Sequence, residues 1–191
     1  PAARAGRLDS PVRADLEEGV AMLGVDFILN VVLDGHAIVD AVAGDAIAAH
    51  RAGCEIVARR GMVRLPRPAD IVLASAGGCP KDMNLYQAQK ALDNAAGAVR
   101  DGGTVILLAE CPEGYGNATF EAWLREAACP DDVLRRIQER FVLGGHKAAA
   151  VAGVLKRAAV YLVSGMEPAV VAACGLRPFA SAQAAVDAAL A

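Results

Sequence analysis

The sequence is poor in aromatic residues and has no long apolar run. Of its 191 residues, 4% are aromatic and 55% are hydrophobic, and no uninterrupted apolar stretch approaches the roughly 20 residues that cross a bilayer. The first 18 residues also lack the apolar core of a signal peptide. These absences argue against a membrane protein and a secreted one, and they predict a soluble, cytoplasmic chain.

An excess of basic charge is absent as well. The formal net charge is −3, and lysine and arginine are scattered, with only short pairs such as those at 59–60 and 135–136. A nucleic-acid-binding surface usually needs clustered positive charge, because it must neutralise phosphates. The sequence therefore predicts no nucleic-acid partner.

Cysteine and histidine motifs are also missing. No C-x-x-C pair occurs and the cysteines are odd in number, so we expect free thiols rather than a zinc site or a disulfide framework. The three histidines show no metal-ligand spacing. Cys79 lies in a glycine loop without a nearby histidine that could activate it, which favours a small loop residue over a nucleophile. The five cysteines are Cys54, Cys79, Cys111, Cys129 and Cys174.

Alternating apolar patterns predict an α/β fold. We expect a layered domain with a mainly parallel sheet flanked by helices, preceded by a helix and a β-hairpin. Ser10 and Gly24 are suitable residues to begin and end the first helix, and Asp34-Gly35 is a dipeptide favoured in hairpin turns. The expected domains are a leading interdomain segment at 1–24 and an α/β domain at 25–191.

The remaining elements follow from periodicity and turn residues. Residues 69–110 predict a βαβ unit with buried parallel strands, and no G-x-G-x-x-G supports a dinucleotide-binding fold. Further helices are expected at 45–60, 85–99, 120–124, 131–140, 147–157, 167–173 and 181–190, and strands at 63–65, 69–74, 103–110, 159–163 and 176–179.

A candidate site follows the strand at 69–74. Gly77 and Gly78 would form a loop at the carboxyl end of this strand, where ligands of open α/β sheets bind and helix amino termini expose backbone donors. On the next helix, Tyr86, Gln87 and Lys90 are three or four residues apart, so their side chains can converge. A phenol, an amide and a cation together suit a carboxylate or a hydroxy acid.

Structural roles explain the same residues equally well. Asn84 could cap the helix with Gln87 folding back onto it as a variant capping box, Lys90 could be solvated, and Tyr86 could belong to the core. Asp82 is more typical of a turn-forming residue than of a catalytic acid.

Two later segments could face the same crevice. Glu113, Tyr115 and Asn117 follow the strand at 103–110, although a glycine-rich turn needs no function. His146 stands at the start of a helix, where it could bind a ligand or act as an acid or base, but a capping or solvated role is more typical.

Four segments, in this order and spacing, resemble the nickel-pincer lactate racemase family, specifically its carboxyl-terminal domain. They are DFILNVVLDGHAIVDAVAGDAIAAHRAG, GGCPKDMNLYQAQKAL, GGTVILLAECPEGYG and LGGHKA. The resemblance covers nearly the whole chain. It implies a 2-hydroxy acid racemase or epimerase in which hydride moves between the substrate and a nickel-pincer nucleotide.

The resemblance also implies roles for particular residues. Gln87 and Lys90 would contact the substrate, with Tyr86 beside them, and His146 would occupy the place of a large side chain that lines the family's site. Cys79 stands where the family has tyrosine. The catalytic histidines, the lysine that holds the cofactor and the nickel ligand belong to an amino-terminal domain that is missing here.

The resemblance thus implies that the chain is the substrate-clamping part of a longer enzyme and is inactive alone. It would hold no metal and no cofactor, and its partners would be the amino-terminal domain and a small 2-hydroxy acid. The alternative is a stand-alone module that binds small anions or a partner without catalysis.

Overall fold

The computed structural model describes residues 8–191, and the chain divides into two compact units, Pro1–Arg64 and Leu65–Ala191. The first seven residues of the segment expected at 1–24 lie outside the described residues. In this division the hairpin belongs to the same unit as the helices before and after it, and the domain boundary expected after residue 24 stays a prediction. An interdomain role for residues 1–24 stays a prediction.

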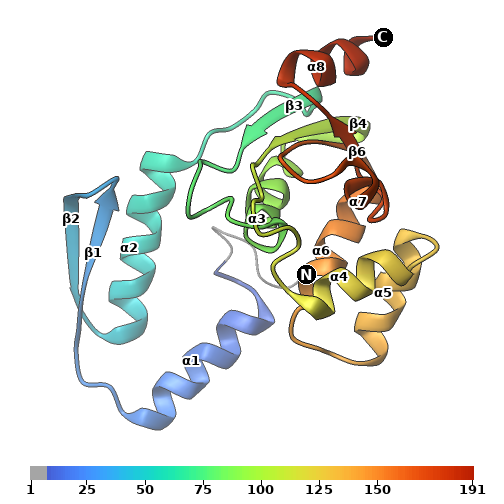
Figure 1. Cartoon of the computed structure of the whole chain (residues 1–191). Coiled ribbons are helices and arrows are strands. Elements are labelled where there is room, and N and C mark those ends of the chain that lie inside the picture. The colour runs from blue at the N-terminus through green and yellow to red at the C-terminus, as the bar shows by residue number, and fades with distance from the viewer. Residues whose placement is uncertain (1–7) are drawn as a thin grey trace. The chain divides into compact units, whose positions relative to one another are not determined.

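The first unit begins with helix α1 (Pro11–Leu23), which has the expected ends. Ser10 Oγ accepts a hydrogen bond from Arg13 N at 3.2 Å, and Gly24 adopts the left-handed conformation, with φ of 65°. The unit continues with strands β1 (Ile28–Asp34) and β2 (Ala37–Gly44) and helix α2 (Ala46–Gly61). Figure 1 shows the hairpin beside α2.

The hairpin turn lies one residue later than expected. Asp34 pairs with Ala37, so the loop is Gly35-His36 rather than Asp34-Gly35. Gly35 has φ of 59°, which is the backbone region that primed hairpin turns require. The strands are antiparallel, and their register shifts between Val32 and Leu33.

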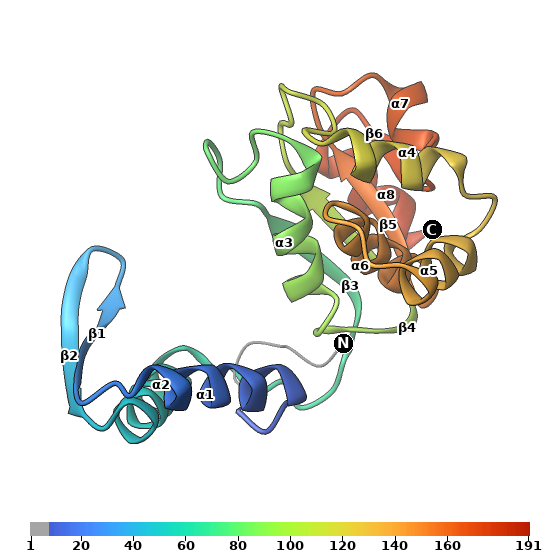
Figure 2. The same cartoon turned by 90° about the horizontal axis from the view of Figure 1, so that it is seen from below.

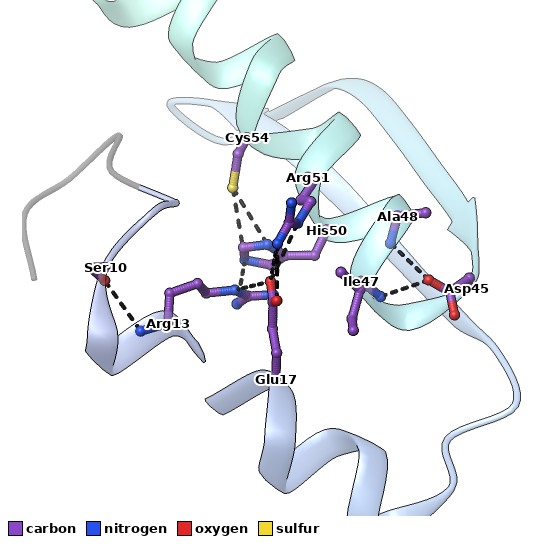
Figure 3. A network of polar contacts seen from close by, with 9 residues as sticks. All are labelled: Ser10, Arg13, Glu17, Asp45, Ile47, Ala48, His50, Arg51 and Cys54. Atoms are coloured by element: carbon purple, nitrogen blue, oxygen red, sulfur yellow. Dashed lines mark hydrogen bonds and ion pairs between the residues drawn. The ribbon is translucent and has the colours of Figure 1, made fainter. Parts of the chain in front are cut away.

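A carboxylate connects α1 to α2 (Figure 3). Glu17 accepts hydrogen bonds from Arg51 Nη2 at 3.0 Å and from Arg13 Nε at 2.8 Å. These bonds, that of Arg51 foremost, lower the pKa of Glu17 below its usual value. His50 Nε2 lies 3.4 Å from Arg13 Nη1, and its Nδ1 lies 3.6 Å from Cys54 Sγ.

The second unit contains a four-stranded parallel sheet in the order β3-β4-β5-β6. This arrangement confirms the predicted fold class and the βαβ unit. The expected strand at 63–65 does not form, and its residues are exposed to solvent. The strands are β3 (Ala69–Ser75), β4 (Val99–Leu108), β5 (Ala159–Val163) and β6 (Arg177–Phe179).

Helices cover both faces of this sheet (Figures 1 and 2). The larger core contains Val105 and Leu107 of β4 and side chains of the helices between β3 and β6, whereas Ile106 points to the other face and packs with Ala185. This alternation follows from the period of two in a strand. The helices of the larger core are α3 (Leu85–Ala95), α4 (Ala118–Glu126), α5 (Pro130–Glu139), α6 (Gly145–Leu155) and α7 (Pro168–Ala172), and the other face carries α8 (Ala182–Leu190).

The prediction that one helix covers 85–99 was wrong at its end. Helix α3 stops at Ala95, and β4 begins at Val99, four residues before the expected strand. Arg157 Nη2 donates hydrogen bonds to the carbonyl oxygens of Ala96, at 2.9 Å, and Val99, at 2.7 Å. This long-range contact satisfies carbonyl groups at the helix end, which would otherwise lack partners.

All five cysteines are free, as expected. Over residues 8–191, no helix combines the length and the apolar character needed to traverse a lipid bilayer.

Candidate functional site

The candidate site begins at the loop between β3 and α3. Gly77 and Gly78 have φ of 93° and 73°, a region that side-chain-bearing residues rarely adopt. The amide of Gly77 donates to Ser75 Oγ at 3.1 Å, and the amide of Lys81 donates to the Gly78 carbonyl at 2.8 Å. The two glycines therefore turn the chain away from the carboxyl end of β3, as expected.

The amino terminus of α3 does not expose free backbone donors, contrary to the expectation. The amide of Leu85 donates to the Gly114 carbonyl at 2.9 Å, and the amide of Tyr86 donates to the Tyr115 carbonyl at 3.2 Å. The amide of Gln87 donates to Asn84 Oδ1 at 3.0 Å. Because these amides are occupied, a ligand at this helix must be recognised by side chains.

Gln87 and Lys90 are in direct contact. Lys90 Nζ donates to Gln87 Oε1 at 2.8 Å. Asn84 caps the helix, but among the described residues no bond joins the Gln87 side chain to the Asn84 backbone. The Gln87 side chain therefore does not complete the alternative capping box, and it is directed to Lys90 instead.

Both side chains line a cavity of about 770 Å³ between β3 and α3. Val72 and Ala74 line it from β3, because alternate residues of a strand share one face, and Ala76 lines it just after the strand. Along with Gln87 and Lys90, the other lining residues are Ser75, Pro80, Lys81, Met83, Ala91, Asn94 and Ala95.

The Gln87–Lys90 pair presents mainly donors to this cavity. The atom of Gln87 that faces Lys90 must be the oxygen, because an ammonium can only donate. Gln87 therefore keeps its two amide N–H groups for a ligand, and Lys90 keeps two of the three N–H groups of its ammonium. Such an arrangement favours an anionic ligand rich in acceptor oxygens, such as a carboxylate.

Tyr86 points elsewhere and does not line the cavity. Its ring meets Phe120 edge-on, with centroids 5.6 Å apart, and it lies under Lys147 Nζ, 4.3 Å from the ring centroid. Lys147 Nζ also donates to the Tyr86 carbonyl oxygen at 2.8 Å. Burial, and then the positive charge of Lys90, lower the pKa of Lys147.

His146 does not line the cavity either. Its Nδ1 accepts a hydrogen bond from the Gly144 amide at 3.3 Å, and its ring stacks on Phe141 with centroids 5.7 Å apart. The ring thus contacts the segment just before α6, and among the described residues no side chain caps this helix. The structure thus brings Gln87 and Lys90 together at the cavity but places Tyr86 and His146 outside its lining.

The side chains expected after β4 have structural roles. Glu113 Oε2 accepts from Asn84 Nδ2 at 3.1 Å, Tyr115 Oη donates to the Val170 carbonyl at 2.7 Å, and Asn117 caps α4. Asp82 is buried, and its Oδ2 accepts from the Glu110 amide at 3.2 Å. The bonds of Asn84 and Asp82 hold the loop after β3 against the loop after β4.

The thiols in the loops after β3 and β4 differ in their exposure. Cys79 is exposed, while burial raises the pKa of the Cys111 thiol to about 12. Within residues 8–191, no three histidine, cysteine, aspartate or glutamate side chains are close enough to hold a metal ion. The described residues therefore do not fit the role of nickel ligands.

Three site residues were not anticipated from the sequence. Asn94 lies four residues after Lys90, so helical periodicity could have indicated it. Lys81 follows the glycine loop and lines the cavity. Lys147 reaches Tyr86 from a helix 61 positions later, and no local pattern signals that contact.

Residues 65–191 match the family model of the lactate racemase C-terminal domain. The chain belongs to this family. It is 42% identical over 142 residues to a lactate racemase of Thermoanaerobacterium thermosaccharolyticum, covering 73% of this chain, and 35% identical over 139 residues to one of Lactiplantibacillus plantarum, covering 70%. It spans only about a third of each enzyme, 33% and 32% respectively.

A solved structure agrees with this assignment to the lactate racemase family. The lactate racemase apoprotein of T. thermosaccharolyticum matches with a TM-score of 0.92 and 35% identity, over 99% of this chain and 47% of the other. A protein from Thermotoga maritima with 19% identity and a TM-score of 0.67, over 92% of this chain and 48% of the other, shares the fold.

Proposed function

We propose that this chain is the substrate-clamping, carboxyl-terminal part of a racemase or epimerase of 2-hydroxy acids. The observation that carries the proposal is the Gln87–Lys90 pair, which lines a cavity in a lactate racemase family domain. A longer protein is part of this proposal, because the lactate racemases it resembles are about three times as long as the matched segment.

In this proposal Lys90 binds the carboxylate of the substrate, and the Gln87 amide donates to the carboxylate or the hydroxyl oxygen. Lys90 is exposed in this chain, so its charge is screened by water. Covering the cavity would strengthen both contacts, because electrostatic interactions grow as water is excluded. A hydrogen bond to a charged group is worth about 1.5–3 kcal/mol.

The cofactor is assigned to the amino-terminal part of the longer protein. The family resemblance implies a nickel-pincer nucleotide as the centre that exchanges hydride, but residues 8–191 offer no set of ligands for the metal. The residues of this chain are therefore proposed to bind and orient the substrate only.

Racemisation assays test the proposal. We expect the full-length protein, purified with its cofactor, to interconvert the enantiomers of at least one acid in a panel of 2-hydroxy acids followed by chiral chromatography. The 191-residue chain should bind the same acid weakly and convert none. If the full-length protein binds hydroxy acids without converting any, a binding module is the better description.

We propose that the amino-terminal part of the longer protein covers the outer face of the β1–β2 hairpin. A Cβ on Gly53 of α2 would lie 3.3 Å from Val42 Cγ2, so Val42 and the side chains beside it face α2. Leu29, Val31 and Leu33 alternate with that set on β1 and are 71%, 42% and 58% exposed. Such an apolar face on a soluble protein usually marks an interface.

The position of this unit in the chain supports this choice of occupant. The matched family domain begins at residue 65, so the hairpin precedes it in the chain and is adjacent in sequence to the amino-terminal part of the relatives. In the proposed longer protein, residues that precede the hairpin would bury its exposed apolar face. The hairpin and α2 are therefore proposed to be a piece of that upstream domain.

Lysine substitutions on the hairpin should have different effects in the two proteins. Leu29→Lys with Leu33→Lys should leave the stability of the 191-residue chain nearly unchanged, because both side chains are exposed there, but should destabilise the full-length protein by on the order of 3 kcal/mol, because an unpaired charge becomes buried there. Val32→Lys, at a position that is 5% exposed, is the control and should destabilise both. Denaturant unfolding measures these effects, and an unchanged free energy of unfolding in the full-length double variant would refute the assignment.

A further inference from the structure

Lys147 contacts Tyr86 through both the backbone and the side chain of that residue. Its Nζ donates to the Tyr86 carbonyl oxygen at 2.8 Å and lies 4.3 Å from the centroid of the Tyr86 ring. Lys147 belongs to the first turn of α6, and Tyr86 to the first turn of α3. One ammonium group therefore connects the beginnings of two helices that are distant in sequence.

The surroundings of Lys147 oppose a charge there. The side chain is partly buried, and burial followed by the charge of Lys90 lowers its pKa. An ammonium group tolerates such a place only when its donors are satisfied, and the Tyr86 carbonyl and ring provide that compensation. The contact between Lys147 and Tyr86 is thus the interaction that holds this cation in position.

The geometry separates Lys147 from the ligand-binding surface. Lys147 is absent from the lining of the cavity, whereas Gln87, the residue after Tyr86, and Lys90, one turn further along α3, both line it. Phe120 also contacts the Tyr86 ring, edge-on at 5.6 Å between centroids. Tyr86 is therefore anchored by Phe120 and Lys147 while its neighbours point into the cavity.

We propose that Lys147 is a positioning residue that fixes the first turn of α3, and thereby the direction in which Gln87 and Lys90 project into the cavity. Its kinetic consequence rests on the proposed function, but its structural consequence does not. The amide of Lys90 is the helical partner of the Tyr86 carbonyl, so the same contact also supports the backbone that carries Lys90.

Two measurements on the full-length protein test this role. Hydrogen exchange followed by mass spectrometry should show amides at 86–91 exchanging about tenfold faster in Lys147→Met than in the wild type, because local opening becomes easier. The value of kcat/KM for the hydroxy acid should fall about 10- to 100-fold, since small displacements of binding groups are costly. Lys147→Arg should restore much of the exchange protection and much of kcat/KM, because arginine can donate to the Tyr86 carbonyl and stack on the Tyr86 ring.

Lys156→Met is the matched control. Lys156 follows the same helix and pairs with Asp131 at the surface, outside the cavity, so this variant should resemble the wild type in both measurements. Unchanged exchange in Lys147→Met together with reduced kcat/KM would show that Lys147 meets the substrate itself, and unchanged values of both would also overturn the proposal. If the wild type converts no hydroxy acid but the amides of Lys147→Met still exchange faster, the proposed function is refuted and the positioning role stands.

Discussion

Replacing Lys90 by alanine in the full-length protein is expected to lower kcat/KM for the hydroxy acid by about 10- to 150-fold. The estimate corresponds to the loss of one hydrogen bond to a charged group, about 1.5–3 kcal/mol, at tenfold per 1.4 kcal/mol. Steady-state racemisation kinetics measure the change. Wild-type kinetics in this variant would eliminate Lys90 from the site.

The folded structure should tolerate this substitution. Lys90 is exposed and its polar contact is with Gln87 on the surface of the same helix, and surface substitutions of this kind usually alter stability by less than about 0.5 kcal/mol. Lys156→Ala is the control because it removes an equally exposed lysine that pairs with Asp131 away from the cavity. An unchanged melting temperature with reduced kcat/KM in Lys90→Ala alone would assign the loss to substrate binding.

Combining this variant with Gln87→Met should reveal the coupling between the two residues. Lys90 and Gln87 share a hydrogen bond of 2.8 Å, so each prepares the other for the ligand. The double variant should lose less than the product of the two separate losses, because residues in direct contact are non-additive. Strict additivity would mean that the two side chains act on the substrate independently.

The sequence predicted the elements whose signals are local. Ser10, Pro11 and Gly24 delimit α1 in the structure as their capping preferences indicate. The parallel strands were predictable because their apolar runs are short and bounded by turns. The end of α3 was missed for a long-range reason, because Arg157 from a later segment binds the carbonyl groups of Ala96 and Val99.

In the candidate site, too, local contacts were predictable from the sequence and long-range contacts were not. Helical spacing was sufficient to place Gln87 near Lys90. The spacing could not indicate that carbonyl groups of Gly114 and Tyr115 occupy the first amides of α3, nor that Lys147 holds Tyr86. Those contacts depend on how separate loops and helices pack, which periodicity along one segment does not encode.

The loop that closes the start of α3 has little space for a side chain at Gly116. This glycine has φ of 75°, and an added Cβ would lie 2.6 Å from Asn84 Cβ and would overlap the Asn84 amide group. Asn84 is 7% exposed and caps α3. We expect Gly116→Ala to lower the free energy of unfolding by about 3 kcal/mol, combining left-handed strain with overpacking.

Gly114→Ala separates the two causes. Gly114 also has a positive φ, 63°, but a Cβ there would meet nothing within 4 Å, so we expect only the backbone strain of about 1 kcal/mol. Denaturant unfolding of the two variants measures the difference. Equal losses would show that the loop moves freely away from Asn84.

A second substitution at the cap should rescue Gly116→Ala. Asn84→Gly removes the three atoms nearest to the new Cβ, all of them in the Asn84 side chain, and glycine replaces asparagine at an N-cap for only a few tenths of a kcal/mol. The double variant should therefore be more stable than Gly116→Ala alone, by about 2 kcal/mol if overpacking dominates. Because the overlap at Gly116 would displace Asn84 and with it the start of α3, Gly116→Ala should also lower kcat/KM in the full-length protein, and the double variant should regain it together with stability. Recovered stability without recovered kcat/KM would mean that the asparagine cap itself, and not only the space around it, sets the direction of Gln87 and Lys90.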